Sequence, residues 1–189
     1  MADHLVDIVN ERDEVVGSDL KSRKAELGFI SRASAVFLHD SEGNIVVCKR
    51  APHKKFSPNL YDLAAVGSVC AGETYEEAAR RELLEEVGII CDLTLLDVHY
   101  QEAIEGGAMM RHFCGIFLGR SDEEPRLNDE LSSWKKLSFQ QLVDDLSNEP
   151  DSYCPGLVND FRHVEEKLSR HFAKGKSKYD DFDFMSRRF

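Results

Sequence analysis

Short apolar runs separated by polar turns predict several β-strands. A hairpin is expected at the start of the chain, where residues 5–9 and 15–17 flank a polar turn. A second hairpin is expected around the glycine-containing turn 40–44, between the runs 34–38 and 45–49. Further runs rich in β-branched or aromatic residues predict strands at residues 63–66, 93–100 and 112–118.

Three other segments have the apolar spacing of helices. The clearest is 75–87, which follows the capping residue Thr74 and stops at Gly88. Ser138 begins a second capping box, which predicts a short helix to about residue 146. A third helix is predicted from Pro155, because one of its faces would carry Leu157, Phe161, Val164 and Leu168.

The length of 189 residues fits one ordinary globular domain. We expect a single domain over 1–173, with the N-terminal hairpin as an extension and a C-terminal helix, followed by a charged tail over 174–189. Apolar stretches such as 33–38 fall far short of the roughly 18 residues that cross a bilayer, so no membrane contact is expected. Without a basic and then apolar leader at the N-terminus, the expected location is the cytoplasm.

Charge and cysteine usage narrow the possible partners. The chain has 24 Lys and Arg against 35 Asp and Glu, a net charge of −11 that would repel the backbone of a nucleic acid polymer. A small phosphorylated molecule can still bind an acidic enzyme when divalent cations lie between the carboxylates and the phosphate oxygens. The five cysteines are odd in number and form no CxxC pair, which predicts reduced thiols rather than disulfides or a structural zinc site.

The predicted helix 75–87 carries an unusual set of carboxylates. At 100° per residue, Glu82, Glu85 and Glu86 fall within an arc of roughly 100°. Three such groups repel one another, and a divalent cation such as Mg²⁺ removes that cost by binding their oxygens. The alternative is a solvated helix stabilised by ion pairs four residues apart, for which the candidates are Glu76 with Arg80 and Glu77 with Arg81.

The spacing around this helix matches the pattern Gx5Ex7REUxEExGU, in which U is aliphatic. The fixed positions are Gly67, Glu73, Arg81, Glu82, Leu83, Glu85, Glu86, Gly88 and Ile89. This segment resembles the Nudix box, and the order of strands and helices from about residue 33 to 146 is also similar to a Nudix domain. The resemblance implies an α/β fold, an α/β/α sandwich with a mixed sheet, whose loop–helix–loop binds Mg²⁺ or Mn²⁺.

The same resemblance assigns roles to the matched residues. It implies that Glu82, Glu85 and Glu86 are metal ligands, with Glu82 also a possible base for water. Arg81 would orient the cluster and Glu73 would pair with it, while Gly67 and Gly88 are structural residues of the motif. The implied reaction is hydrolysis of a phosphoanhydride in a nucleoside diphosphate linked to another group X, by in-line attack of water at phosphorus.

Three residues outside the box are further site candidates. Glu130 precedes a predicted strand through Trp134, where many Nudix relatives have an additional carboxylate that serves as ligand or base; an exposed loop acid is the alternative. Lys49 and Arg50 end the predicted strand 45–49 and could contact phosphate oxygens, and for Arg50 a surface charge is the alternative.

Residues 6–17 and 56–62 resemble Nudix proteins related to type I isopentenyl-diphosphate isomerase. Aligned on Gly72 and Glu73, however, Val66 stands where the isomerase has its catalytic cysteine. The positions of its histidines and later glutamates fall at or near Lys24, Ser31, Ser68, Met110 and His112. We therefore expect an isomerase-like scaffold that retains the carboxylates of a hydrolase. An isomerase and a non-catalytic nucleotide-sensing module remain the alternatives.

The remaining cysteine and histidine positions give no clear chemical pattern. Cys70 is interpreted as a small loop thiol, because no basic neighbour is evident that would favour a thiolate. His99, His112, His163 and His171 have no ligand spacing and are assigned packing or surface roles. The N-terminal hairpin and the C-terminal helix are candidate surfaces for a homodimer, and the group X is left open.

Overall fold

The computed structural model describes residues 3–105 and 107–176. Its strands are β1 (Leu5–Val9), β2 (Val15–Leu20), β3 (Ile30–His39), β4 (Asn44–Arg50), β5 (Tyr61–Asp62), β6 (Ala65–Ser68), β7 (Leu93–Glu105), β8 (Ala108–Arg120) and β9 (Leu131–Ser138). Its helices are α1 (Lys24–Leu27), α2 (Tyr75–Val87), α3 (Phe139–Asn148) and α4 (Pro155–Lys176), with 3₁₀ turns at Lys21–Arg23 and Pro150–Ser152.

Strand β3 joins most of the sheet together. It pairs in parallel with β8, from Ile30 opposite Arg111 to His39 opposite Arg120. It also pairs antiparallel with β1, β4 and β6, while β2, β5, β7 and β9 are added through these neighbours and β8. Within the described residues this gives one sheet of nine strands with both parallel and antiparallel pairs, which confirms the predicted mixed sheet.

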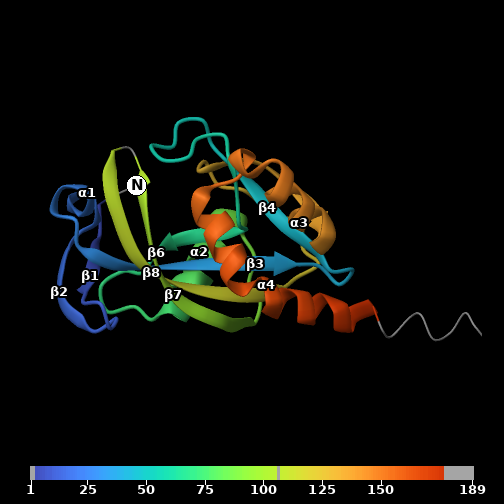
Figure 1. Cartoon of the computed structure of the whole chain (residues 1–189), viewed down its shortest axis with the longest axis horizontal. Helices are drawn as coiled ribbons and strands as arrows, with labels where there is room; N and C mark the ends of the chain where they lie inside the picture. The colour runs from blue at the N-terminus through green and yellow to red at the C-terminus, as the bar shows by residue number, and fades with distance from the viewer. Residues whose placement is uncertain (1–2, 106, 177–189) are drawn as a thin grey trace, which may run out of the picture.

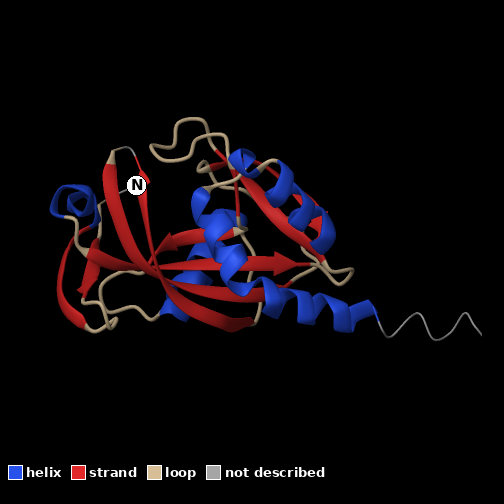
Figure 2. Cartoon of the chain, viewed as in Figure 1, coloured by secondary structure: helices blue, strands red, loops and turns tan. Residues whose placement is uncertain are grey.

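Helices cover both faces of this sheet, which confirms the predicted α/β/α sandwich (Figures 1 and 2). Alternate residues of β3 and β4 point to opposite faces. On one face, Phe37 and Val47 pack in a core with α3 and α4. On the other face, Val36 and Val46 pack in a second core with α2. In Figure 1, α4 lies in front of the sheet and α2 lies behind it.

The predicted helix boundaries follow from local capping. Thr74 and Ser138 each form a capping box, and Gly88 ends α2 with a φ of 69°, a conformation that favours glycine. The predicted apolar face of α4 is buried at Leu157, Phe161, Val164 and Leu168. Helix α4 continues to Lys176, so the first part of the segment 174–189 is helical rather than tail, and the rest lies outside the described residues. No helix among the described residues is long and apolar enough to cross a membrane.

The prediction of one strand at 63–66 was wrong. Tyr61–Asp62 pairs with β4, whereas Ala65–Ser68 pairs with β3, so the chain changes partner between them. The carboxylate of Asp62 accepts a hydrogen bond from the backbone N–H of Leu63 at this change of direction, 3.0 Å away. The predicted strands 93–100 and 112–118 lie within the longer strands β7 and β8. The strands continue through residues 101–105 and 108–111, and in the sequence of 101–111 charged residues and glycines separate short apolar runs.

Small residues let α2 approach the sheet closely. Ala78 and Ala79 have no exposed surface. A Cβ atom added to Gly67 would lie 1.9 Å from Cδ of Glu82, and one added to Gly115 would lie 2.7 Å from Cδ1 of Tyr75. Strands β6 and β8 therefore have no side chain beneath α2 at Gly67 and Gly115. The carboxylate of Glu82 lies against the backbone of Gly67.

Gly115→Ala is expected to lower the free energy of unfolding by about 1–3 kcal/mol, because the new methyl group must displace the Tyr75 ring. Gly17→Ala is the matched control, since a Cβ there would meet nothing within 4 Å. Chemical denaturation of both variants measures the difference. Equal stability of the two variants would contradict the close packing of α2.

Candidate active site

Arg81 organises the first turns of α2 and the loop before it. Its Nε and Nη2 donate to the two carboxylate oxygens of Glu73 at 2.8 and 2.9 Å. Nη1 donates to Glu82 at 2.7 Å, and Nη2 also donates to the carbonyl of Ser68 at 3.0 Å. These hydrogen bonds from Arg81 hold the pKa of Glu73 below its usual value. The fork of one guanidinium thus ties the strand β6, the loop and the helix together.

The carboxylates of Glu82, Glu85 and Glu86 have different surroundings. Glu86 is buried and accepts a hydrogen bond from the backbone N–H of Val66 at 3.0 Å. Burial, followed by repulsion from Glu82, raises the pKa of Glu86 to about 8. Burial also raises the pKa of Glu82, although Arg81 opposes that shift. The side chain of Glu85 is 54% exposed, and its carboxylate lies 3.7 Å from Nη1 of Arg81.

The three carboxylates lie on one side of α2 but are not gathered around a single point. Among the described residues, only His99, Cys114 and Asp160 bring three potential ligand atoms within 4.8 Å of one another. The contacts of the glutamates differ: Glu82 accepts from Arg81, Glu85 lies 3.7 Å from Arg81, and Glu86 accepts from the backbone of Val66. Burial is the main cause of the raised pKa of Glu86, and repulsion from Glu82, Asp62 and Glu130 adds to it. An oxygen-rich, anionic donor set of this kind fits Mg²⁺ or Mn²⁺.

Glu130 lies near the same carboxylates. Its side chain is 14% exposed and forms an ion pair with Lys54, so the alternative of an exposed loop acid was wrong. Repulsion from Glu130 contributes to the raised pKa of Glu86. The position of Glu130 follows from the pairing of β9 with β4, which places the loop before β9 next to Ala51. The backbone N–H of Ala51 donates to the carbonyl of Glu130 at 2.8 Å.

Two lysines that the sequence analysis did not identify belong to this region. Lys54 pairs with Glu130, and Lys21 follows the N-terminal hairpin. The side chain of Lys21 is exposed to solvent, and the carboxylates of Glu82 and Glu130 attract its ammonium. Lys54 lies two residues before the segment 56–62. The resemblance of that segment to the isomerase-related proteins was therefore a signal in the sequence that could have pointed to Lys54.

Lys49 and Arg50, at the end of β4, have different neighbours. The Nη1 of Arg50 lies 3.2 Å from the buried carboxylate of Asp62, and its Nε donates to the carbonyl of Phe56 at 3.2 Å. The ammonium of Lys49 lies 5.6 Å from the ring centre of Tyr61. The structure thus places Arg50 beside the loop that carries Lys54, and places Lys49 on the face that packs with Tyr61.

The interpretation of Cys70 needs one correction. A basic neighbour is present, because Nη2 of Arg81 lies 3.7 Å from the Cys70 sulfur. Burial nevertheless raises the pKa of Cys70, and Arg81 offsets this only in part. The thiol therefore stays protonated at neutral pH, as expected of a loop thiol.

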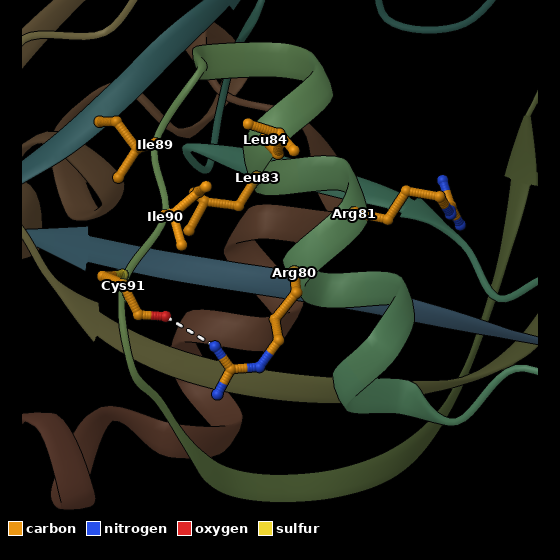
Figure 3. A pocket seen from close by; sticks show the side chains of 7 residues that line it. All are labelled: Arg80, Arg81, Leu83, Leu84, Ile89, Ile90 and Cys91. Atoms are coloured by element: carbon orange, nitrogen blue, oxygen red, sulfur yellow. Dashed lines mark hydrogen bonds between the residues drawn. The ribbon is translucent and has the colours of Figure 1, made fainter.

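An apolar hollow on the outer side of α2 is separate from this cluster (Figure 3). Its lining residues are Arg80, Arg81, Leu83, Leu84, Ile89, Ile90 and Cys91. Arg80 points into it and donates to the carbonyl of Cys91 at 2.9 Å, whereas Arg81 extends away (Figure 3). None of the three carboxylates lines the hollow.

The side chain of Lys24 is buried at one of the positions where the resemblance to the isomerase would place a metal-binding histidine. Lys24 is 7% exposed, and its Nζ donates to the hydroxyl of Ser31 at 2.7 Å. His112 pairs with Ser31 across β3 and β8. Burial, followed by repulsion from Lys24, lowers the pKa of His112 to about 3, so its imidazole is neutral.

Residues 30–155 match the NUDIX domain family. The chain is similar to the uncharacterized Nudix hydrolase PA4841 from Pseudomonas aeruginosa, with 33% identity over 84% of this chain and 91% of that protein. It is also similar to Isopentenyl-diphosphate Delta-isomerase 2 from Photorhabdus laumondii, with 33% identity over 80% of this chain and 86% of that protein. The crystal structure of DR0079 from Deinococcus radiodurans superimposes with a TM-score of 0.70 and 28% identity, covering 88% of this chain and 98% of that one.

The mixed sheet, the loop–helix–loop and these matches define a Nudix fold. The chain belongs to the NUDIX family. This membership supports a hydrolase and a divalent metal cofactor, which Nudix hydrolases generally use.

Arg81→Gln is expected to reduce the free energy of unfolding by about 1–3 kcal/mol, because Glu73 and Glu82 lose the donor they share. The neighbouring variant Arg80→Gln loses the exposed pair with Glu76 and an exposed hydrogen bond to the carbonyl of Cys91, and is expected to cost less than about 1 kcal/mol. Urea denaturation of both variants provides the comparison. A cost for Arg81→Gln no larger than that for Arg80→Gln would argue against its organising role.

Proposed function

We propose that this protein hydrolyses a phosphoanhydride bond in a small diphosphate compound, a nucleoside diphosphate linked to another group X. The observation that carries the proposal is the set of acidic groups on and beside α2, Glu82, Glu85, Glu86 and Glu130, with the basic side chains of Arg81, Lys21 and Lys54 next to it. The carboxylates are suited to bind a divalent cation, and the ammonium groups beside them are suited to bind phosphate oxygens. Together they form a site that is complementary to a diphosphate with its cation.

Glu82, Glu85 and Glu86 would hold Mg²⁺ or Mn²⁺. The cation, when bound, supplies neutralisation of charge on the diphosphate oxygens. Burial raises the pKa of Glu86, and repulsion from Glu82 adds to the shift. The repulsion supports this assignment, because a cation would remove it.

The remaining roles belong to the side chains of the chain itself. Arg81 holds Glu82 and Glu73 in place, as its forked hydrogen bonds indicate. Lys21 and Lys54 bind phosphate oxygens and orient the phosphorus for in-line attack by water. The proton of that water passes to Glu82 or to Glu130, both of which lie within this cluster and remain the candidate bases.

The contacts of Arg50 support a role as a phosphate ligand better than the contacts of Lys49 do. Arg50 ends β4 and bonds to the loop that carries Lys54, so a phosphate held by Lys54 would lie near its guanidinium. The ammonium of Lys49 lies beside the Tyr61 ring, and Lys49 serves as a phosphate ligand only if its side chain leaves that ring.

The isomerase alternative is favoured by the similarity to Isopentenyl-diphosphate Delta-isomerase 2 over most of both chains. The contacts of Lys24 favour hydrolysis instead, because its buried ammonium would repel a cation at the positions of the isomerase histidines. Val66 also offers no proton donor at the position of the catalytic cysteine. Incubation with isopentenyl diphosphate separates the two activities, since isomer formation without phosphate release would establish an isomerase.

We further propose one NUDIX domain, flanked by the hairpin β1–β2 and by α4, acting in the cytoplasm on a small molecule. The hairpin and α4 are the candidate surfaces of a homodimer.

The function is tested by a Mg²⁺-supplemented screen of nucleoside di- and triphosphates, dinucleotides, nucleotide sugars and prenyl diphosphates. Release of phosphate or pyrophosphate from at least one class is the expected result, and release from none would contradict the proposal.

Glu85→Gln is expected to lower kcat by about 100-fold or more, because several kcal/mol of charge stabilisation depend on the cation that this carboxylate helps to hold. The exposed Glu76 lies on the same helix and pairs with Arg80, so Glu76→Gln is the matched control and should keep wild-type turnover. Steady-state kinetics on the substrate from the screen measure both variants. Binding of a nucleotide without turnover by the wild-type protein would instead indicate the sensing module.

Lys21→Gln is expected to raise KM about tenfold with a smaller change in kcat, because one charged contact to the diphosphate is lost. Arg23→Gln is the control from the same turn, since Arg23 pairs with Asp19. If Lys21→Gln leaves KM unchanged at low ionic strength, Lys21 is not a substrate ligand.

A further inference from the structure

Three side chains of different chemistry meet on the face of the sheet opposite α2. They are His99 from β7, Cys114 from β8 and Asp160 from α4, and their potential ligand atoms lie within 4.8 Å of one another. His99 and Cys114 are direct neighbours across the β7–β8 pairing, and α4 supplies Asp160 from above. Cys114 belongs to the core that packs with α3 and α4, so this cluster is separate from the carboxylates of α2.

One distance within the cluster already matches the spacing of metal ligands, and the other is that of a hydrogen bond. Nε2 of His99 lies 2.7 Å from Oδ1 of Asp160, and the sulfur of Cys114 lies 3.7 Å from Oδ2. In a tetrahedral zinc site with bonds of about 2.0–2.3 Å, neighbouring ligand atoms are about 3.3–3.7 Å apart. Small rotations of His99 and Asp160 would therefore open the cluster enough for an ion.

The charge of the cluster also favours a divalent cation. Asp160 is 2% exposed and Cys114 is 1% exposed, and burial raises the pKa of both groups. A divalent ion bound by one thiolate, one carboxylate and one neutral imidazole has a formal charge of zero. Such a site buries no net charge, whereas without the ion the carboxylate of Asp160 is buried with its contacts to His99, Gln101 and Cys114 alone among the described residues.

Neighbouring residues hold two of the three ligands in position. The amide of Gln101 donates to Oδ1 of Asp160 at 3.1 Å. The ring of His163 stacks on His99 with centres 4.2 Å apart, and its Nε2 lies 3.3 Å from Asp97. Contacts of this kind orient metal ligands in proteins.

We propose that His99, Cys114 and Asp160 form a binding site for a zinc-class divalent cation, distinct from the hard-cation site on α2. Nitrogen and sulfur ligands select zinc or cobalt, whereas the all-oxygen set of Glu82, Glu85 and Glu86 suits Mg²⁺ or Mn²⁺. On binding, the Cys114 thiol releases its proton to solvent and a sulfur–metal bond forms, with no change of oxidation state. The ion also replaces the hydrogen bond between His99 and Asp160.

The test is a titration of the full chain with Co²⁺ in the presence of excess Mg²⁺, followed by absorption spectroscopy. One equivalent should produce the near-ultraviolet charge-transfer band of a thiolate–cobalt bond. Cys114→Ser should abolish that band, and Asp160→Asn should weaken Co²⁺ binding at least about tenfold. Cys154→Ser is the matched control, because Cys154 is a buried free thiol in the same core and should leave the band intact.

Glu85→Gln should also leave the band intact, because it alters only the site on α2. Absence of the band from the wild-type protein, or its persistence in Cys114→Ser, would overturn the proposal. Cadmium-113 NMR of the wild-type protein gives a reading that needs no variant. A resonance shifted downfield by one sulfur ligand is the expected result, and a spectrum with only all-oxygen sites would contradict the assignment.

Discussion

The negative charge that α2 places against the sheet is the constraint on which the rest of the candidate active site depends. Gly67 allows the carboxylate of Glu82 to lie against bare backbone, and Glu86 is buried one turn later. Charge of one sign at this depth is unfavourable unless hydrogen bonds or cations compensate it. Arg81 compensates part of it, while burial and repulsion from Glu82 together raise the pKa of Glu86. This part of the fold therefore favours the binding of positive charge. It is also the place where a diphosphate and its cation would bind.

Elements distant in the sequence supply charges around this helix. The N-terminal hairpin leads to Lys21, the loop after β4 carries Lys54, and the loop before β9 carries Glu130. The opposite face of the sheet has a different chemistry, in which Asp160 meets an imidazole and a thiol. The two faces therefore present hard oxygen donors and softer nitrogen and sulfur donors, with one sheet between them.

Local rules made the helices and the motif predictable from the sequence. Thr74, Ser138 and Gly88 act on neighbouring backbone groups, and the Arg81–Glu73 pair lies within one loop–helix unit. The partner change between β5 and β6 depends on tertiary pairing and was missed. Lys21 and the Asp160 cluster were missed for the same reason: His99 and Asp160 are 61 positions apart, and no periodicity relates them.

A crystal structure of the protein soaked with Mn²⁺, with anomalous diffraction to locate the ion, tests the central claim most directly. The account predicts an anomalous peak whose ligands include Glu82, Glu85 and Glu86. A saturating Mn²⁺ concentration that leaves these three carboxylates in their metal-free positions, with the ion bound elsewhere, would contradict it.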